Sequence, residues 1–167
     1  MDELLDVVDE KDRVISQQKR SLVKAQKLNH RISHVWVFCE EKLLICKRPR
    51  TIESHPNQWT STAGGHVNTN ETYAQAATRE SLEELGLNLN LKRAFNLRVE
   101  CLDSSLRFID LWYAYVEDIS SLIFDSKEIC DNKLISFEEL ERWIGKSPQV
   151  FNPELLSLYE RWKKVMK

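Results

Sequence analysis

Three kinds of feature are scarce in this chain of 167 residues: long apolar runs, paired cysteines and glycine. No apolar run approaches the ~20 residues of a membrane-spanning helix, and the opening MDELLDVVDE has neither the basic start nor the apolar stretch of a signal peptide. The four cysteines include no Cys-x-x-Cys pair and no histidine at zinc-ligand spacing. We therefore expect a cytoplasmic protein with free thiols, without a zinc site and without membrane association.

A strong excess of charge is also missing, because 24 basic and 26 acidic residues leave a formal net charge of −2. Such a balance gives no broad attraction to a nucleic-acid duplex, so any nucleotide is expected in a pocket as a small molecule. The hydrophobic share of 42% and the charged share of 30% are ordinary for a globular domain. The length suits a single domain over residues 1–167.

Apolar alternation and β-branched residues predict strands along much of the chain. LLDVV and RVIS flank a turn and predict an N-terminal hairpin, and SHVWVFCEEKLLICKR predicts two strands joined by a tight turn. LNLNLKRAFNLRVE and SLRFIDLWYAYVED predict two more strands, while SFEELERWI and PELLSLYERWKKVM are expected helices. Strands mixed with helices on either side of a central sheet fit an α/β/α sandwich.

The few glycines are concentrated at one place, since Gly64, Gly65 and Gly86 are three of the four. Thr72 and Gln75 form an S/T-x-x-E/Q capping box, and Gly86 stands where a helix would stop, so a helix is expected between them. Glycine lets a backbone approach a ligand closely. The sequence therefore predicts a ligand-binding loop at Gly64 and Gly65 directly before a helix.

Three carboxylates on this expected helix, Glu80, Glu83 and Glu84, stand at positions i, i+3 and i+4 and share one face. Like charges so placed repel by roughly 0.2–0.5 kcal/mol per pair on an exposed helix. Mg²⁺ or Mn²⁺ would offset that repulsion, because both ions prefer oxygen ligands. A solvated glutamate-rich helix is the plainer interpretation of these three alone, but a glycine loop that leads into the same helix favours a site for a divalent cation and a phosphate.

Residues 65–87 resemble the Nudix box, G-x5-E-x7-R-E-U-x-E-E-x-G-U, in which U is aliphatic. The one departure is Ser81 at the first U position, where a bulky apolar residue normally packs under the helix. LLDVVDEKDRVI, WTSTAGGHV and KLISFEEL look like a bacterial branch of Nudix hydrolases related to isopentenyl-diphosphate isomerase. The residues that match the fixed letters are Gly65, Glu71, Arg79, Glu80, Glu83, Glu84, Gly86 and Leu87.

The resemblance implies a fold, an activity and a metal site. The fold is a Nudix α/β/α sandwich with a mixed central sheet, an N-terminal hairpin and connection over 1–30 and C-terminal helices over 136–167. The activity is metal-assisted hydrolysis of a diphosphate linkage in a nucleoside diphosphate derivative or a related organic pyrophosphate. Glu80, Glu83, Glu84 and the Gly65 carbonyl would hold Mg²⁺ or Mn²⁺.

The resemblance also implies supporting and acid–base roles. Glu71 and Arg79 would pair to orient the helix and the loop. The general base would be either Glu83 or a carboxylate outside the box, for which Glu128 is the first choice and Asp131 the second.

Four further residues are candidates for substrate binding: Lys47, Arg48, Gly64 and His66. Lys47 and Arg48 end an expected strand and could direct cationic groups at phosphate oxygens, although a solvated surface position explains them equally well. Gly64 and His66 flank the metal-binding glycine. His66 and His30 resemble metal-binding histidines of the isomerase, and either one could equally be a structural histidine with a hydrogen-bonded ring.

Three alternative functions stay open at this point. An isomerase is disfavoured, because WTSTAGGH places Gly64 where the isomerase carries its essential cysteine. A non-catalytic nucleotide sensor would be expected to have lost metal carboxylates, and none is lost. A protein scaffold rests only on the basic ending RWKKVMK, which a solvated helix end explains better. The substrate, the number of metal ions and the oligomeric state stay open, with a homodimer as the default expectation.

Overall fold

The computed structural model describes residues 2–166, so Met1 and Lys167, at the ends of the expected hairpin and helical segments, lie outside the described residues. Helices and strands are mixed along the chain, as expected for an α/β protein. In chain order they are β1 (Leu4–Val8), β2 (Val14–Lys19), α1 (Arg20–Ala25), β3 (His30–Cys39), β4 (Lys42–Lys47), β5 (Trp59–Thr60), β6 (Ala63–His66), α2 (Tyr73–Leu85), β7 (Lys92–Glu100), β8 (Leu106–Tyr115), η1 (Ile119–Ser121), β9 (Asp131–Ile135), α3 (Phe137–Lys146), η2 (Pro148–Val150) and α4 (Pro153–Val165).

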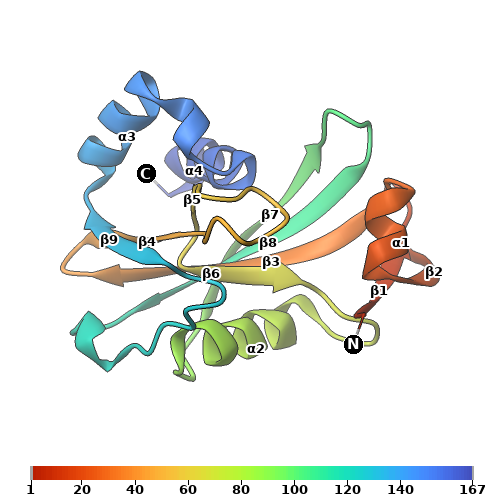
Figure 1. The fold of residues 1–167 in the computed structure, drawn as a ribbon, viewed down its shortest axis with the longest axis horizontal. Helices are drawn as coiled ribbons and strands as arrows, with labels where there is room; N and C mark the ends of the chain where they lie inside the picture. The colour runs from red at the N-terminus through yellow and green to blue at the C-terminus, as the bar shows by residue number, and fades with distance from the viewer. Residues whose placement is uncertain (1, 167) are drawn as a thin grey trace.

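A seven-stranded mixed sheet forms the centre of the molecule, with the strand order β5-β4-β3-β8-β7 (Figure 1). Strands β3 and β8 run parallel, whereas the other paired strands of this sheet run antiparallel. Strand β6 pairs with β3, and β9 pairs with β4. The predicted mixed central sheet is therefore confirmed, and β3 and β4 each pair with three other strands of it.

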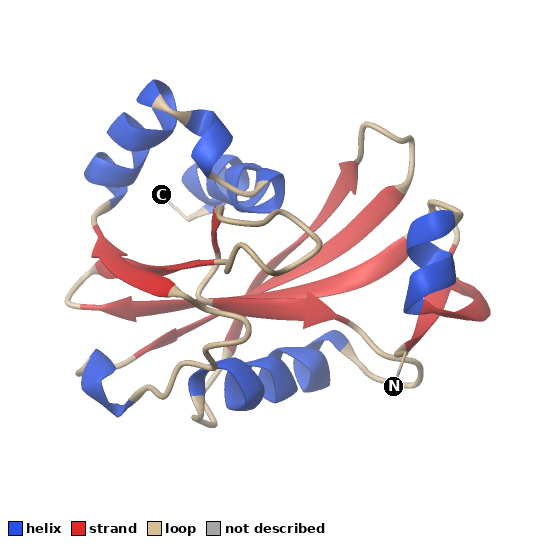
Figure 2. Cartoon of the chain, in the orientation of Figure 1, coloured by secondary structure: helices blue, strands red, loops and turns tan. Residues whose placement is uncertain are grey.

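Helices cover both faces of this sheet, with α2 on one face and α3 and α4 on the other (Figure 2). Successive side chains of a strand point to opposite faces, and β3 follows this rule with large apolar residues in both directions. Trp36 and Phe38 pack with residues of α3 and α4, whereas Val35 and Val37 pack with residues of α2. The chain thus has the predicted α/β/α sandwich with two apolar layers.

A small N-terminal unit, β1, β2 and α1, lies beside the main sheet (Figure 1). Strands β1 and β2 pair antiparallel, which confirms the predicted hairpin. Leu5 and Val7 of β1 pack against Val23 of α1, with Leu28 over them. The hairpin and the helix are held together by this small apolar cluster, which brings α1 to the edge of the cavity described below.

The structure differs from the prediction at the glycine segment, which forms the short strand β6 where a loop was expected. Gly65 pairs with Ser33 and Gly64 pairs with His34 in the antiparallel register of β6 and β3. A Cβ at Gly64 would lie 2.8 Å from the Ser33 carbonyl oxygen and 2.9 Å from His34 Nδ1. Glycine is needed here because β6 lies close to the side chains and backbone of β3.

Every helix among residues 2–166 is too short or too polar to cross a bilayer.

Gly86 and Gly145 offer a matched test of how the helices end. Gly86 follows α2 at a φ of 68°, and a Cβ there would lie 3.0 Å from Ile123 Cβ, whereas Gly145 lies within α3 with open space around it. We expect Gly86→Ala to lower the free energy of unfolding by about 1–2 kcal/mol and Gly145→Ala to raise it by about 0.5–1 kcal/mol. Urea denaturation measures both changes in unfolding free energy. Equal effects of the two substitutions would contradict the left-handed, crowded position assigned to Gly86.

Candidate functional site

Helix α2 carries the acidic side of the candidate site and is capped at both ends. The Gln75 N–H donates to the Thr72 hydroxyl, and the Thr72 N–H donates to the Gln75 side chain, which confirms the predicted capping box. Gly86 ends the helix in the left-handed conformation. Ser81 is fully buried and donates to the Ala77 carbonyl over 2.8 Å, so its hydroxyl is satisfied within the helix. The carboxylates of α2 therefore stand on a well-defined helix.

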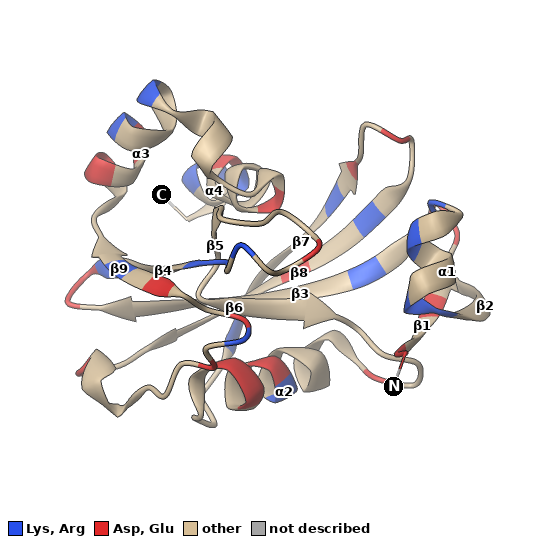
Figure 3. Ribbon diagram, viewed as in Figure 1, with Lys and Arg blue, Asp and Glu red and all other residues tan. Residues whose placement is uncertain are grey.

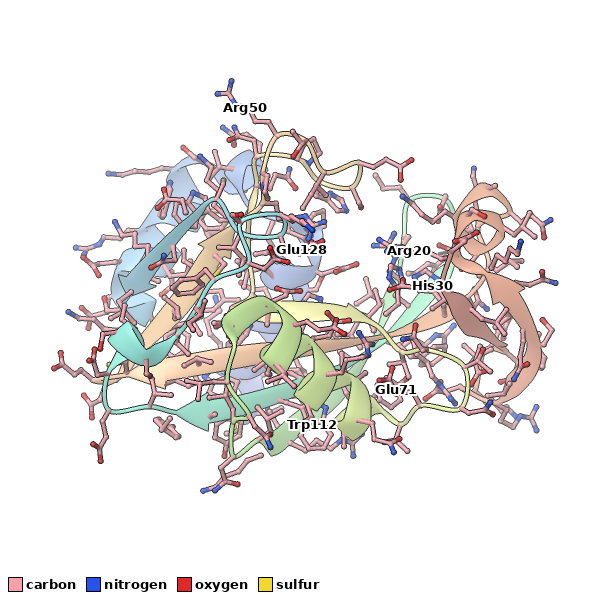
Figure 4. All side chains as sticks on the ribbon, turned by 60° about the horizontal axis from the view of Figure 1, so that its bottom comes forward. Arg20, His30, Arg50, Glu71, Trp112 and Glu128 are labelled. Carbon is pink, nitrogen blue, oxygen red and sulfur yellow. The ribbon has the colours of Figure 1, made fainter. Side chains whose placement is uncertain are left out.

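A cavity of about 590 Å³ lies beside α2 and brings most of the predicted site residues together. Its volume lies within the range of roughly 300–1,000 Å³ that is common for small-molecule sites. Glu128, Arg20 and His30, from three separate parts of the chain, all belong to its wall, and Figure 4 labels their positions. The predicted residues that line the cavity are Arg48, Gly64, Gly65, His66, Glu80, Glu83, Glu84 and Glu128.

Arg79 is the centre of a hydrogen-bond network that joins α2 to the segment before it. Its Nε and Nη2 atoms donate to the two carboxylate oxygens of Glu71 over 2.8 and 3.0 Å, and Nη2 also donates to the His66 carbonyl over 2.9 Å. Its Nη1 atom donates to Glu80 over 2.6 Å and to Glu83 over 3.3 Å. One planar guanidinium thus connects three carboxylates and one strand, which is the geometry that a supporting role for Glu71 and Arg79 requires.

The Glu80 carboxylate lies directly against the backbone of Gly65. A Cβ added at Gly65 would overlap that carboxylate, so only glycine permits the approach. Glu80 is buried and Glu83 is exposed, while Glu84 is half-buried. The three carboxylates therefore meet the cavity at different depths, and the deepest of them lies beside the backbone of β6.

Two carboxyl groups of α2 have raised pKa values. Burial raises the pKa of Glu84 well above its ordinary value, and the charges of Glu80 and Glu128 raise it further. Burial also raises the pKa of Glu80, although Arg79 opposes this effect. Within residues 2–166, Glu80 and Glu83 form ion pairs with Arg79, and Glu84 forms none. Negative charge is thus crowded at the end of the cavity that includes Glu84 and Glu128.

Four predicted residues are not among the described residues that line the cavity: Glu71 and Arg79 of the hydrogen-bond network above, and Lys47 and Asp131. Lys47 and Arg48 are consecutive at the end of β4, and Arg48 lines the cavity. The Lys47 ammonium instead lies 5.7 Å from the centre of the Trp59 ring. Asp131, the second choice for an outside base, pairs with Lys47 where β9 meets β4. Consecutive residues of an extended chain point in opposite directions, which explains why only one of the two basic residues reaches the cavity.

His30 and His66 lie together in the cavity wall with their ring centres 5.2 Å apart. His30 Nδ1 lies 2.9 Å from the Leu28 carbonyl oxygen, and because a carbonyl can only accept, this nitrogen carries the proton. Burial, together with the smaller effects of His30 and Arg20, lowers the pKa of His66 to about 3. Burial lowers the pKa of His30 as well. Both rings are therefore neutral near pH 7.

A second polar cluster in the cavity wall does not figure in the predicted site. Glu154 at the start of α4 is buried and accepts hydrogen bonds from Arg107 of β8 over 2.5 Å and from His34 of β3 over 3.0 Å. Burial alone would raise the pKa of Glu154, but hydrogen bonds and charge from His34 and Arg107 outweigh burial and lower it. Asp125 also lines the cavity. These residues are far apart in the chain, so no local spacing could have indicated them.

The acidic end of the cavity fits a hard divalent cation by its donor set. Three carboxylates, those of Glu80, Glu83 and Glu84, line this end, and the backbone of Gly65 lies beside Glu80. Carboxylate and carbonyl oxygens are the ligands that Mg²⁺ and Mn²⁺ prefer. Among residues 2–166, no three acidic, histidine or cysteine side chains are already gathered at ligand spacing. In this arrangement Arg79 donates hydrogen bonds to both Glu80 and Glu83. Those two carboxylates would turn away from Arg79 to share an ion with Glu84.

Comparison with known proteins decides the family. The NUDIX domain family matches residues 28–155 of this chain. The chain belongs to the Nudix family. An uncharacterized Nudix hydrolase of Streptomyces coelicolor is 31% identical to it over 164 residues, which cover 96% of this chain and 88% of that protein. An uncharacterized Nudix hydrolase of Yersinia pestis is 40% identical over 86 residues, which cover 51% of this chain and 47% of that protein.

A solved structure supports the Nudix fold along nearly the whole chain. The crystal structure of DR0079 from Deinococcus radiodurans superposes with a TM-score of 0.83 at 24% identity, over 95% of this chain and 98% of that one. At this identity the likeness shows the fold alone. This Nudix chain spans 47% and 66% of the length of the relatives from Yersinia pestis and Listeria innocua, so it corresponds to only part of those proteins.

Glu84 gives a prediction about the protein freed of metal with a chelator. A carboxyl whose pKa is raised by folding binds more protons in the folded state, so stability falls as the pH rises from the ordinary pKa to the raised one. Each pKa unit of such a shift lowers the free energy of unfolding by about 1.4 kcal/mol once the carboxyl is ionised. We expect Glu84→Gln to raise the free energy of unfolding at neutral pH and to flatten its fall between acidic and neutral pH. Urea denaturation across that pH range measures it.

Glu160→Gln is the control for this substitution, because Glu160 is an exposed helix glutamate outside the cavity. It should leave both the stability at neutral pH and its pH dependence close to those of the unchanged protein. A Glu84→Gln protein with the same pH profile as the control would contradict the crowded charge assigned to Glu84.

Proposed function

We propose that this chain is a metal-dependent hydrolase that cleaves the diphosphate linkage of a small organic pyrophosphate, such as a nucleoside diphosphate derivative. The proposed cation is Mg²⁺ or Mn²⁺, and the proposed site is the acidic end of the cavity beside α2. Membership of the Nudix family and the Nudix hydrolases among the relatives support this reaction class.

The proposal rests on one observation. Glu84 shares the cavity with other carboxylates, and among residues 2–166 it has no ion pair to balance its charge. Burial and the charges of Glu80 and Glu128 raise its pKa well above the ordinary value. Arg79 offsets the charge of Glu80 and Glu83, and Arg48 lowers the pKa of Glu84 only in part. Such a cluster is costly unless a cation binds among the carboxylates. A phosphate ligand alone would add to the repulsion.

The proposed metal ligands are Glu80, Glu83, Glu84 and the Gly65 carbonyl. A bound Mg²⁺ or Mn²⁺ would neutralise phosphate charge and lower the pKa of water. The residues of the chain do the positioning. Arg79 keeps α2 and β6 at a set distance by binding Glu71, the His66 carbonyl and α2 at once.

Proton transfer is assigned to a carboxylate at the acidic end. Glu83 and Glu128 are the two candidates, since both line the cavity and both are exposed enough to exchange protons with water. Arg48 is the proposed phosphate-binding cation, because its side chain lines the same wall while its Nε donates to the Ser54 carbonyl over 2.9 Å. That hydrogen bond leaves the two Nη groups available for a bidentate contact with phosphate oxygens.

Two alternative functions, an isomerase and a sensor without activity, are each disfavoured by particular residues. An isomerase of the isopentenyl-diphosphate type would need a thiol where Gly64 stands, and a Cβ at that position would meet the Ser33 carbonyl and His34. A sensor without activity is the second alternative, and the complete set of box carboxylates speaks against it. We also propose one domain over residues 1–167, while a homodimer and a cytoplasmic location stay predictions.

Glu83→Gln tests the proposed reaction directly. With Mg²⁺ present, we expect the kcat for diphosphate hydrolysis to fall by about 10³-fold or more, because the substitution removes a carboxylate assigned to metal binding or proton transfer. The measurement is the mass of the products released from a panel of nucleoside diphosphate derivatives, with and without Mg²⁺.

Glu160→Gln is a matched control, because the side chains of Glu83 and Glu160 are each 58% exposed and each pairs with a basic residue on its own helix. The control should keep its activity and its thermal midpoint. Equal activity in the Glu83→Gln protein and the control would refute the assignment, as would turnover that is independent of the metal.

Gly65→Ala separates the geometry of the site from its charge. The added Cβ would overlap the Glu80 carboxylate, whose flexible side chain can move away. We expect a thermal midpoint within a few degrees of the unchanged protein but a kcat lower by about 10²-fold, because a displacement near 1 Å can have that effect. Gly145→Ala, which adds the same methyl group in open space, is the control. Unchanged kcat in Gly65→Ala would show that Glu80 need not lie against this backbone.

A further inference from the structure

The cavity has a second end, opposite in charge to the acidic end, that the proposed hydrolysis does not use. Basic side chains from α1, from the turn after α1 and from β8 line this basic end, next to His30 and His66. Figure 3 shows acidic positions on α2, at the lower centre of the view, and basic positions on α1, at its right. The basic residues that line this end are Arg20, Lys24, Lys27 and Arg107.

Most of these cations come from outside the segment that matches the Nudix family. That segment covers residues 28–155, whereas Arg20, Lys24 and Lys27 precede it. Ion pairs fix the first two in place: Arg20 pairs with Glu3 over 3.1 Å, and Lys24 pairs with Glu53 over 2.6 Å. The second pair joins α1 to the loop between β4 and β5. The N-terminal unit therefore adds a wall to the cavity.

Lys27 contacts protein carboxylates less directly than the other cations of this wall, although its charge, after hydrogen bonds from Ser105, lowers the pKa of Asp103, which lines the same cavity. Among residues 2–166 it forms no ion pair within 4.0 Å, and its side chain is exposed at the cavity wall. Its backbone has a φ of 55°, and the Leu28 N–H donates to the Val23 carbonyl over 2.9 Å, so the turn that ends α1 sets its position. A non-glycine residue in this conformation is uncommon. The ammonium is thus presented on a defined turn.

Arg107 is held in place by the buried carboxylate of Glu154, which also accepts a hydrogen bond from His34. Its Nη1 binds Glu154, and its Nε has no hydrogen-bond partner among the described residues. About a quarter of the side chain, 26%, is exposed. A guanidinium fixed by a buried carboxylate loses little further freedom when it binds an anion.

The basic end meets the rest of the cavity at the two histidines. Arg20 and Arg107 line the same cavity as His66, whose ring centre lies 5.2 Å from that of His30. His66 follows Gly65 directly, so the two ends of the cavity meet at β6. A ligand bound at the glutamates and extended past His66 would arrive among Arg20, Lys27 and Arg107.

We propose that the basic end is a subsite for a second anionic group, a phosphate monoester or a carboxylate, on the substrate half that lies farthest from the scissile diphosphate. This inference rests on the proposed function, because it assumes that the diphosphate binds beside α2. It narrows the substrate class to organic diphosphates with three or more anionic groups. Lys27 and Arg107 bind the distal anion, and Glu154 is a positioning residue for Arg107.

Two matched pairs of compounds test the subsite and distinguish its two possible anions. NADPH differs from NADH by one phosphate monoester, and UDP-glucuronate differs from UDP-glucose by one carboxylate. We expect the more anionic member of at least one pair to show a kcat/KM about tenfold higher with Mg²⁺, mainly through a lower KM, as binding away from the reacting atoms predicts. The pair with the larger ratio identifies the anion.

Lys27→Asn removes the charge and keeps the turn, because asparagine accepts a positive φ. We expect it to reduce the preference for the anionic member by about fivefold. Lys11→Asn is the matched control, since Lys11 is an exposed lysine of the same N-terminal unit that does not line the cavity. The double variant Arg107→Gln with Glu154→Gln removes both charges of the buried pair and should also lose the preference.

The outcomes separate this inference from the proposed hydrolysis. Equal kcat/KM within both pairs, or a preference that Lys27→Asn and Lys11→Asn retain equally, would overturn the subsite while the hydrolysis stands. If no compound is cleaved, calorimetric binding of each pair with Mg²⁺ decides, using the unchanged protein. Tighter binding of the anionic member that Lys27→Asn abolishes would keep the subsite and refute the hydrolysis. No measurable difference in binding would overturn the subsite.

Discussion

The hydrogen bonds of Arg79 determine how the candidate site is arranged. One guanidinium binds Glu71, the His66 carbonyl and two carboxylates of α2, so it sets the distance between the helix and β6. It also divides the acidic residues of the helix into two kinds. Glu80 and Glu83 have a positive partner, whereas Glu84 is left among negative neighbours with a raised pKa. The proposed cation would supply the positive charge that Arg79 does not give to Glu84.

Strand β3 connects this site to the rest of the fold. Its apolar side chains supply both layers of the sandwich, and near its start it pairs with the glycines of β6. His34 of the same strand binds Glu154, which in turn holds Arg107. A single strand thus positions the acidic and the basic ends of the cavity, and its register with β6 and β8 sets the distance between them.

The two ends differ in their relation to the family. The acidic end belongs to the segment that matches the Nudix family, and it supports a reaction common to organic pyrophosphates. The basic end is built largely by α1 and the turn after it, which precede that segment. The two proposals thus place reaction chemistry and substrate choice in different parts of the chain, which is consistent with the general separation of a fold from the groups that give it specificity.

The sequence by itself determined whatever depends on short spacing. The capping box, the stop at Gly86, the hairpin and the shared face of the α2 glutamates follow from helix and strand periodicity and from local hydrogen bonds, and all are present. Only the tertiary structure decided that Arg48 lines the cavity while Lys47 lies over Trp59, and that β6 is a strand. It alone joined Glu154 to Arg107 and His34, which are 47 and 120 residues away. Strand register and long-range packing set those contacts, and no local pattern records them.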